Sequence, residues 1–247
     1  MAASNMTEDF LRRQVAACTR MLNGEGILGY SGHVGARLPD RADAILIQSF
    51  EQSRSQVEPN DLLIVGLDGK VVSAPPGMEP PDEVSIHLEI LRARPDVAAV
   101  LHFHPDLPVL FTLVEDIELK PIKNHAFRWA SGIPVHPDPA KIVKTPQAKA
   151  LAQTLGSHHA ALLRAHGAVI VSESVPALMI DAVHFVENAE VLYQALMLGK
   201  PRFLSTEEMK DIEKKQGRAR HIEKLWAYYV SRGLAASTLP EAWGTGL

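Results

Sequence analysis

The stretch VAAVLHFHPDLPVLFT, residues 97–112, decides the fold and the chemistry expected of this chain. It is an apolar run that ends in His102 and His104, after which Pro105 breaks the pattern and a short helical segment follows. Successive side chains of a β-strand point to opposite faces, so the two histidines should share one face and Phe103 the other. Two converging neutral imidazoles suit a divalent metal ion, and polar residues that merely end a strand are the competing interpretation.

The composition is that of an ordinary globular protein. The 247 residues allow one large α/β domain or two small ones, with 46% apolar and 22% charged residues. The net charge is −4 without basic runs, so we expect no nucleic-acid partner. No apolar stretch could cross a bilayer, and segment 1–14 lacks the apolar core of a secretory signal. The single cysteine, Cys18, fits a reducing compartment, so we expect a cytoplasmic protein without membrane contact.

The N-terminal part of the chain predicts one helix and two strand pairs. The helix should span 7–22, and the strands should be 33–38 with 44–48, followed by a hairpin over 61–72. The loop Tyr30-Ser31-Gly32-His33 precedes the first of these strands. Its backbone amides could receive an anion, or the loop could be only a tight turn.

A helix should begin at Pro81-Asp82 and reach Arg94, immediately before the His102 strand. Glu83 and His87 are four residues apart and should therefore lie on one face of this helix. The helix dipole favours a carboxylate in the first turn, so Glu83 has a structural interpretation as well as a functional one.

The segment after Thr112 has weak periodicity and contains Lys123, His125 and Arg128 close together. Long irregular segments rich in polar groups are often active-site loops, although a solvated loop is the alternative for any one residue. A histidine beside a glycine, His166, then stands at the junction of two apolar strands, 160–164 and 168–172. His166 is the third candidate ligand.

Three helices complete the pattern. The first should span 145–155 with Thr145 as N-cap, the second is a long apolar helix over 176–198, and the last should start at a Ser205–Glu208 capping box and reach the 230s. We find no internal repeat or interdomain linker, so we expect a single domain over 1–247, with a core at about 8–200 and a C-terminal helix and tail at 205–247.

Four groups should therefore come together: Glu83, His102, His104 and His166. Three imidazoles with a carboxylate or water form an open divalent site, the arrangement used for catalysis. A cupin also uses an H-x-H pair, but it continues in β-structure with a glutamate shortly afterwards. Here Pro105 and LPVLFTL follow instead, which argues against a cupin.

The chain resembles the class II aldolase/adducin family over roughly 10–198. The resemblance rests on three segments: GYSGHVGAR (29–37), PPDEVSIHLEILRARPDVAAVLHFHP (80–105) and LLRAHGAVIVSESVPALMIDAVHFVENAEVLY (162–193). It implies an α/β/α sandwich with a central, mainly antiparallel sheet, and a fourfold-symmetric tetramer with active sites between subunits. It also implies one divalent metal per subunit, held by His102, His104 and His166, with Glu83 as ligand or acid/base. Zn, Mn, Fe and Co all accept this ligand set.

Two departures from the sugar-phosphate aldolases favour the decarboxylase branch of the family. His33 stands where those aldolases usually carry asparagine, and Pro80-Pro81-Asp82 replaces their serine- and threonine-rich phosphate cradle. The pattern is similar to relatives that decarboxylate hydroxylated aromatic or heteroaromatic dicarboxylates. Adducin-type relatives without activity lack the metal histidines, so the resemblance implies an enzyme.

The leading hypothesis is a metal-dependent decarboxylase of a small hydroxylated carboxylate, the second a class II aldolase, and the third a non-catalytic interaction domain. A hydroxyarene carboxylate must be protonated at the carbon that bears the leaving group. The candidate acids are Glu83, His33 and His125. The candidates for substrate binding are Ser31, Gly32, Arg37, Lys123 and Arg128, since arginine is a good bidentate partner of carboxylates.

Overall fold

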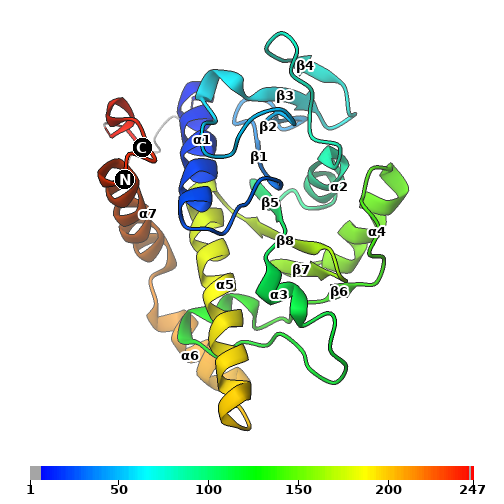
Figure 1. Ribbon diagram of the computed structural model, residues 1–247, viewed down its shortest axis with the longest axis vertical. Coiled ribbons are helices and arrows are strands. Elements are labelled where there is room, and N and C mark those ends of the chain that lie inside the picture. The colour runs from blue at the N-terminus through cyan, green and yellow to red at the C-terminus, as the bar shows by residue number, and fades with distance from the viewer. Residues whose placement is uncertain (1–6, 245) are drawn as a thin grey trace.

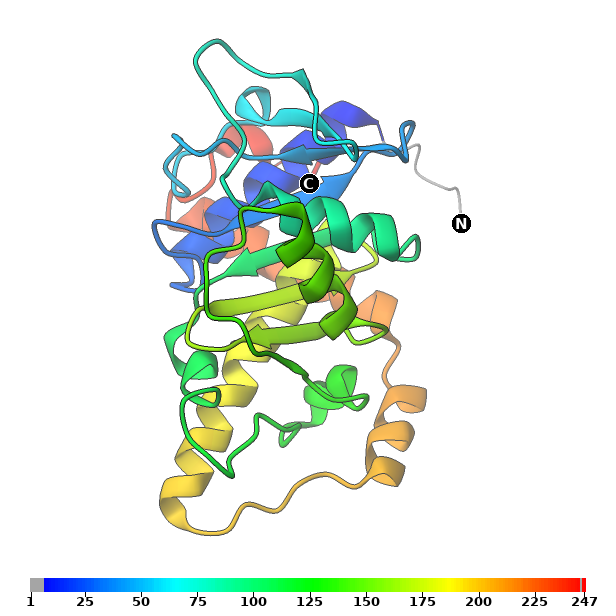
Figure 2. The ribbon, with the colours of Figure 1, turned by 90° about the vertical axis from the view of Figure 1, so that its right-hand side faces the viewer.

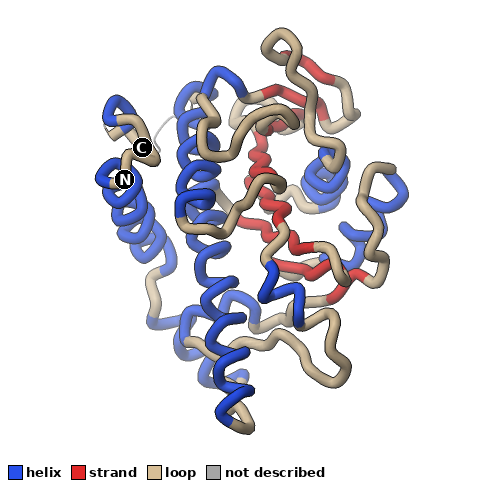
Figure 3. Tube along the Cα trace, in the orientation of Figure 1, coloured by secondary structure: helices blue, strands red, loops and turns tan. Residues whose placement is uncertain are grey.

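The computed structural model describes residues 7–244 and 246–247. The first six residues, part of the segment in which we expect no secretory signal, lie outside the described residues. One sheet forms the middle layer, with helices on both faces (Figures 1 and 3). Its strands are β1 (His33–Arg37), β2 (Ala44–Ile47), β3 (Leu63–Gly66), β4 (Val71–Ser73), β5 (Ala99–Phe103), β6 (Val135–His136), β7 (Ala160–Leu163) and β8 (Gly167–Ser172). The helices are α1 (Glu8–Gly24), α2 (Val84–Ala93), α3 (Asp106–Leu110), α4 (Thr145–Leu155), α5 (Val175–Leu198), α6 (Thr206–Lys215) and α7 (Arg218–Ala235).

The eight strands follow the order β4-β3-β2-β1-β5-β8-β7-β6. Every neighbouring pair is antiparallel except β6 and β7. The expected α/β/α sandwich with a mainly antiparallel sheet is therefore confirmed. The strand that carries the H-x-H pair, β5, lies between β1 and β8, with His102 opposite His33 on one side and Val169 on the other.

The alternation of side chains along β5 separates two hydrophobic cores. Leu101 and Phe103 belong to the core beneath α1 and α5, whereas Val100 belongs to the core beneath α2 and α4. His102 has the same parity as Val100, so it faces the layer of α2 and α4, which lies toward the viewer in Figure 2. The start of α2 is thereby brought over the end of β5, and this placement builds the candidate site.

The C-terminal region differs from the single helix expected from the sequence. The Ser205–Glu208 capping box is present and starts α6, but this helix ends at Lys215, and α7 begins at Arg218. Gly217 occupies the N-cap of α7, and the break lets Arg218 reach Asp181 on α5. The expected N-cap at Thr145 is also wrong, because Lys144 is the N-cap of α4 and Thr145 is its first helical residue.

The long apolar helix was correctly predicted and is α5. It contacts α1, α7 and β8, and it runs along one face of the sheet (Figure 1). Toward its C-terminal end Tyr193, Met197 and Leu198 are exposed. Among the described residues, no helix combines the length and apolarity that a membrane span requires.

Candidate functional site

A cluster of one carboxylate and three imidazoles lies at the end of β5. Glu83 is the N-cap residue of α2, His102 is in β5, His104 follows β5, and His166 is in the turn between β7 and β8. One possible ligand atom from each of these four residues lies within 4.8 Å of the others. The Glu83 carboxylate oxygens are 3.3 Å from His102 Nε2 and 3.6 Å from His166 Nε2. The four residues predicted from the sequence are therefore brought together.

The surrounding hydrogen bonds leave nitrogen lone pairs directed into the cluster. A carbonyl oxygen can only accept, so His102 Nδ1–H donates to Ala168 O at 3.1 Å, and in the neutral imidazole, the form that binds metals, Nε2 carries the free lone pair. This Nε2 is buried and has no hydrogen-bond partner among the described residues. His104 Nδ1 is 2.9 Å from the Ser31 hydroxyl, which leaves its Nε2 available. Outer contacts of this kind orient the ligands of metal sites.

The protonation states also suit a cation. Burial would raise the pKa of Glu83, but the neighbouring His102 and His166 and the Ile142 amide hold it well below its usual value. Burial and the neighbouring imidazoles lower the pKa of His104 to about 4. Glu83 is thus ionised and His104 neutral at pH 7, the states in which both bind divalent metals.

Gly167 allows the His166 turn to approach the cluster. A Cβ atom at this position would lie 2.5 Å from Phe103 O and 2.9 Å from His104 Cδ2, so a side chain would push β8 away from β5. Ala165 on the other side of His166 has a φ of 55°, in the left-handed region. The orphaned His102 nitrogen, the ionised carboxylate and this close approach together fit a divalent cation with an open coordination position.

A second pair of histidines lies directly beneath the cluster. His33 Nδ1 and His87 Nε2 are 2.6 Å apart, and the His33 ring centroid is 5.4 Å from that of His102. His87 is fully buried, and its Nδ1 has no partner among the described residues. A buried N–H without an acceptor costs more than a buried lone pair without a donor, so the unpartnered Nδ1 of His87 should be the unprotonated nitrogen. His87 Nε2 then carries the proton and donates to His33 Nδ1. In that tautomer the remaining nitrogen of His33, Nε2, carries a proton.

The sequence placed His87 on the Glu83 face of α2 but gave it no role. Gly35 of β1 makes room for the His87 ring, because a Cβ atom at position 35 would lie 2.5 Å from His87 Nδ1. The spacing of four residues from Glu83 was the signal that could have identified His87. Burial lowers the pKa of His87 to about 3, and burial together with His87 and His102 lowers that of His33 well below its usual value.

A cavity of about 550 Å³ opens beside the cluster. Ser31, Gly32 and His33, which the sequence nominated, line it together with Glu83, His104 and His166. Arg54 and Lys141 line it as well, and neither was predicted from the sequence. Both come from polar loops whose position depends on tertiary contacts, and no local pattern marks them.

Arg37 is not brought to this cavity, which corrects its nomination as a substrate-binding residue. Its guanidinium donates to the backbone carbonyls of Ala42 and Leu91, both at 2.6 Å, and it also reaches Val97 O and Arg94 O. Arg37 therefore joins the far end of β1 to the end of α2. Its role is structural.

Lys123 and His125 lie on the opposite side of the sheet from the cavity, against α5. Lys123 pairs with Glu187 at 2.8 Å, and the His125 ring stacks on His184 with centroids 4.0 Å apart. Burial, His184 and Lys123 lower the pKa of His125 to about 3. Neither residue lines the cavity formed within one chain.

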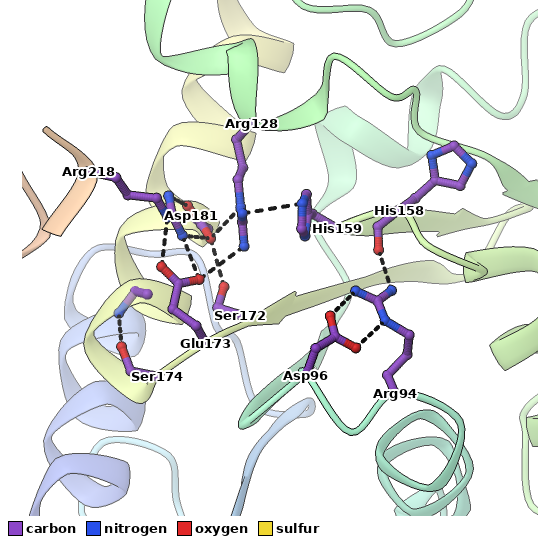
Figure 4. Close-up of polar contacts among 11 residues, drawn as sticks. Arg94, Asp96, Arg128, His158, His159, Ser172, Glu173, Ser174, Asp181 and Arg218 are labelled. Carbon is purple, nitrogen blue, oxygen red and sulfur yellow. Dashed lines mark hydrogen bonds and ion pairs between the residues drawn. The ribbon is translucent and has the colours of Figure 1, made fainter. Parts of the chain in front are cut away.

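Arg128 belongs to an ion-pair network that holds α7 against α5 (Figure 4). It donates to Asp181 at 3.2 Å and to Glu173 at 3.1 Å, while Arg218 donates to the same two carboxylates. Asp181 is buried and also accepts from Ser172 at 2.7 Å. Within one chain, Arg128 is a structural residue and does not contact the cavity.

The characterised relatives of this chain include decarboxylases and aldolases. The 3,4-dihydroxyphthalate decarboxylase of Arthrobacter keyseri is 28% identical over 191 residues, which cover 73% of this chain and 76% of the relative. The 5-methylthioribulose-1-phosphate/5-deoxyribulose-1-phosphate aldolase of Rhodospirillum rubrum is 29% identical over 192 residues, covering 76% and 84%.

Solved structures share the fold. An aldolase II superfamily protein from Pseudomonas syringae superposes with a TM-score of 0.83 at 23% identity, covering 95% of this chain and 96% of that one. An L-fuculose 1-phosphate aldolase from Glaciozyma antarctica gives 0.78 at 17% identity, with 94% and 96% covered. Residues 13–193 match the sequence model of the Class II Aldolase and Adducin N-terminal domain. This chain belongs to the class II aldolase and adducin family.

Proposed function

We propose that this protein is a divalent-metal-dependent decarboxylase of a small hydroxylated aromatic or heteroaromatic carboxylate. The observation that carries the proposal is the imidazole of His33, which lines the cavity beside the metal-type cluster and is oriented by His87. Glu83, His102, His104 and His166 would hold the metal, which supplies Lewis-acid polarisation of a substrate oxygen when bound. The similarity to 3,4-dihydroxyphthalate decarboxylases supports the reaction class.

His33 is the best placed of the three candidate acids. Glu83 is ionised beside the cluster and has no proton to give, and His125 lies outside the cavity of its own chain. The low pKa of His33 reflects burial and neighbouring imidazoles in the free site. An anionic substrate in the cavity would raise this pKa, because a nearby negative charge stabilises the imidazolium. In the imidazolium the hydrogen bond to His87 reverses, with His33 Nδ1–H donating to His87 Nε2.

The proposed reaction replaces the carboxylate on the ring with a proton. His33 delivers a proton to the ring carbon that bears the carboxylate. The bond between this carbon and the carboxylate breaks, carbon dioxide leaves, and the electron pair restores the aromatic ring. Protonation of carbon by a positioned acid is worth about 10²- to 10⁴-fold in rate.

Aldol cleavage is the second candidate, because sugar-phosphate aldolases are found at the same level of identity as the decarboxylases. Both reactions break a carbon–carbon bond next to a carbonyl-type oxygen, and the same metal polarises that oxygen. We expect the metal-loaded protein to release carbon dioxide from hydroxyaryl dicarboxylates. Release of aldehyde from a sugar phosphate, with no carbon dioxide from the aryl substrates, would assign the protein to the aldolases instead. A headspace carbon dioxide assay and a coupled aldehyde assay on one preparation separate the two.

We also propose a homotetramer whose active sites lie between subunits. The exposed apolar residues at the end of α5, Tyr193, Met197 and Leu198, support burial against another copy. The 123–128 segment lies outside the cavity of its own chain, and in such a tetramer a neighbouring subunit's 123–128 segment would face the cavity. We expect sedimentation velocity under assay conditions to give a tetramer. A monomer with full activity would exclude a shared site.

A further inference from the structure

Arg54 is a buried arginine that lines the cavity and has no acidic partner. Only 5% of its surface is exposed, yet within the described residues no carboxylate oxygen lies within 4.0 Å of its guanidinium. Burial lowers the pKa of Arg54, but an arginine still carries its charge at neutral pH. A buried charge without a counter-ion is costly, so a residue of this kind usually meets a ligand.

The hydrogen bonds of Arg54 leave one nitrogen free. Nε–H donates to Gly32 O at 2.9 Å, and Nη1 donates to Ser49 O at 3.3 Å and to Gln52 O. Three of the five guanidinium N–H groups are thereby used on backbone carbonyls. The two hydrogens of Nη2 have no acceptor among the described residues, and Arg54 lines the cavity.

Three other polar side chains of the cavity wall already have partners. Lys141 pairs with Asp82, the Ser31 hydroxyl contacts His104, and His33 contacts His87. Among the described residues that line the cavity, Arg54 therefore contributes the positive charge that lacks a counter-ion. A ligand that enters the cavity meets the metal-type cluster on one side and this charge on another.

We propose that Arg54 is the specificity-determining residue of the cavity and that its Nη2 binds the substrate carboxylate that is not lost. The two hydrogens of Nη2 point in different directions, so this nitrogen contacts carboxylate oxygens end-on. The single positive charge of Arg54 also matches the charge of a carboxylate better than that of a phosphate dianion. The departing carboxylate is the poorer partner, because stabilising it in the ground state would raise the barrier to its loss. The statement that this carboxylate is retained rests on the proposed function, but binding of a carboxylate to Arg54 can be measured without turnover.

The test is calorimetric binding of phthalate and benzoate to the metal-loaded protein. The wild type should bind phthalate at least about tenfold more tightly than benzoate, since phthalate retains a second carboxylate for Arg54. Arg54→Gln should remove this preference, and Arg54→Lys, which keeps the charge, should retain part of it. Arg37→Gln is the matched control, because Arg37 is an arginine equally engaged with backbone carbonyls but remote from the cavity. Its preference for phthalate should be that of the wild type.

Three results would overturn the proposal. Arg54→Gln could bind phthalate as tightly as the wild type does. Both Arg54 variants could lose phthalate and benzoate binding alike, together with metal content, which is the result of a purely structural loop residue. Phosphoglycolate could bind more tightly than phthalate in a manner that depends on Arg54, which would assign the subsite to phosphate. Absence of carbon dioxide release with intact Arg54-dependent phthalate binding would instead overturn the proposed reaction and leave the subsite in place.

Discussion

Replacing His102, His104 or His166 with alanine, one at a time, should abolish tight metal binding and turnover while the fold is retained. The three imidazoles converge with Glu83 within 4.8 Å, so each substitution removes a direct ligand and should lower the affinity for the metal steeply. His102→Ala also removes the hydrogen bond to Ala168 O, so we expect it to cost an additional ~1–3 kcal/mol of stability. Metal stoichiometry after dialysis, circular dichroism and urea unfolding of the metal-free proteins measure these effects.

His158→Ala is the matched control for the metal-ligand variants. His158 contacts the Ser131 hydroxyl at 3.2 Å and lies outside the cluster, so its loss should leave metal content unchanged. A full metal complement in any of the three ligand variants would remove that histidine from the site. Glu83→Gln should lower metal content as well as turnover, because a neutral amide is a weaker ligand than the carboxylate that Glu83 contributes to the cluster. Full metal content with reduced turnover would instead make Glu83 chiefly an acid/base residue.

His33→Asn should reduce decarboxylation by about a hundredfold or more, the usual scale of a positioned general acid. An asparagine amide can still hydrogen-bond to His87, so the buried pair need not collapse, but the amide cannot deliver a proton to carbon. Metal content should stay unchanged, because His33 is not one of the four clustered ligands. The measurement is kcat for carbon dioxide release at saturating substrate, with metal analysis of the same sample.

Two results would count against this role of His33. Near-normal turnover in His33→Asn would show that the imidazole only fills the space beneath the cluster. Efficient cleavage of a sugar phosphate by the wild type would place the protein among the aldolases, in which the equivalent position serves another purpose.

The sequence predicted the centre of the fold because short-range patterns encode it. Strand alternation predicted that His102 and Phe103 face opposite sides of β5, and the cores on the two faces agree. His104 lies just beyond the end of β5 but meets His102 in the cluster, as predicted. Pro81-Asp82 predicted a helix in this region, but α2 begins slightly later, at Val84, so Glu83 is its N-cap residue and lies close to the histidines. These features depend on neighbours in the chain, so they could be read without tertiary information.

The errors arose where position depends on distant contacts. His33 and Arg37 have the same parity in β1 and so share a face, but four residues of strand separate them by about 13 Å. Arg37 therefore reaches the carbonyls at the end of α2, and His33 reaches the cavity. Arg54 could not be predicted, since nothing in the loop that follows β2 indicates that its side chain turns into the cavity. The break between α6 and α7 likewise accompanies an ion pair between Arg218 and Asp181, two residues that lie far apart in the sequence.

The central position of β5 couples the chemistry of the protein to its folding. The clustered residues come from α2, β5 and the β7–β8 turn, and both neighbours of β5 are strands distant from it in sequence. Contacts between such distant segments form late, after much of the chain entropy has been lost. The unfolded chain therefore has no preformed site, and a bound metal would shift the folding equilibrium in proportion to its binding free energy. A metal that binds only the folded chain should therefore raise the free energy of unfolding of the metal-loaded protein above that of the metal-free protein.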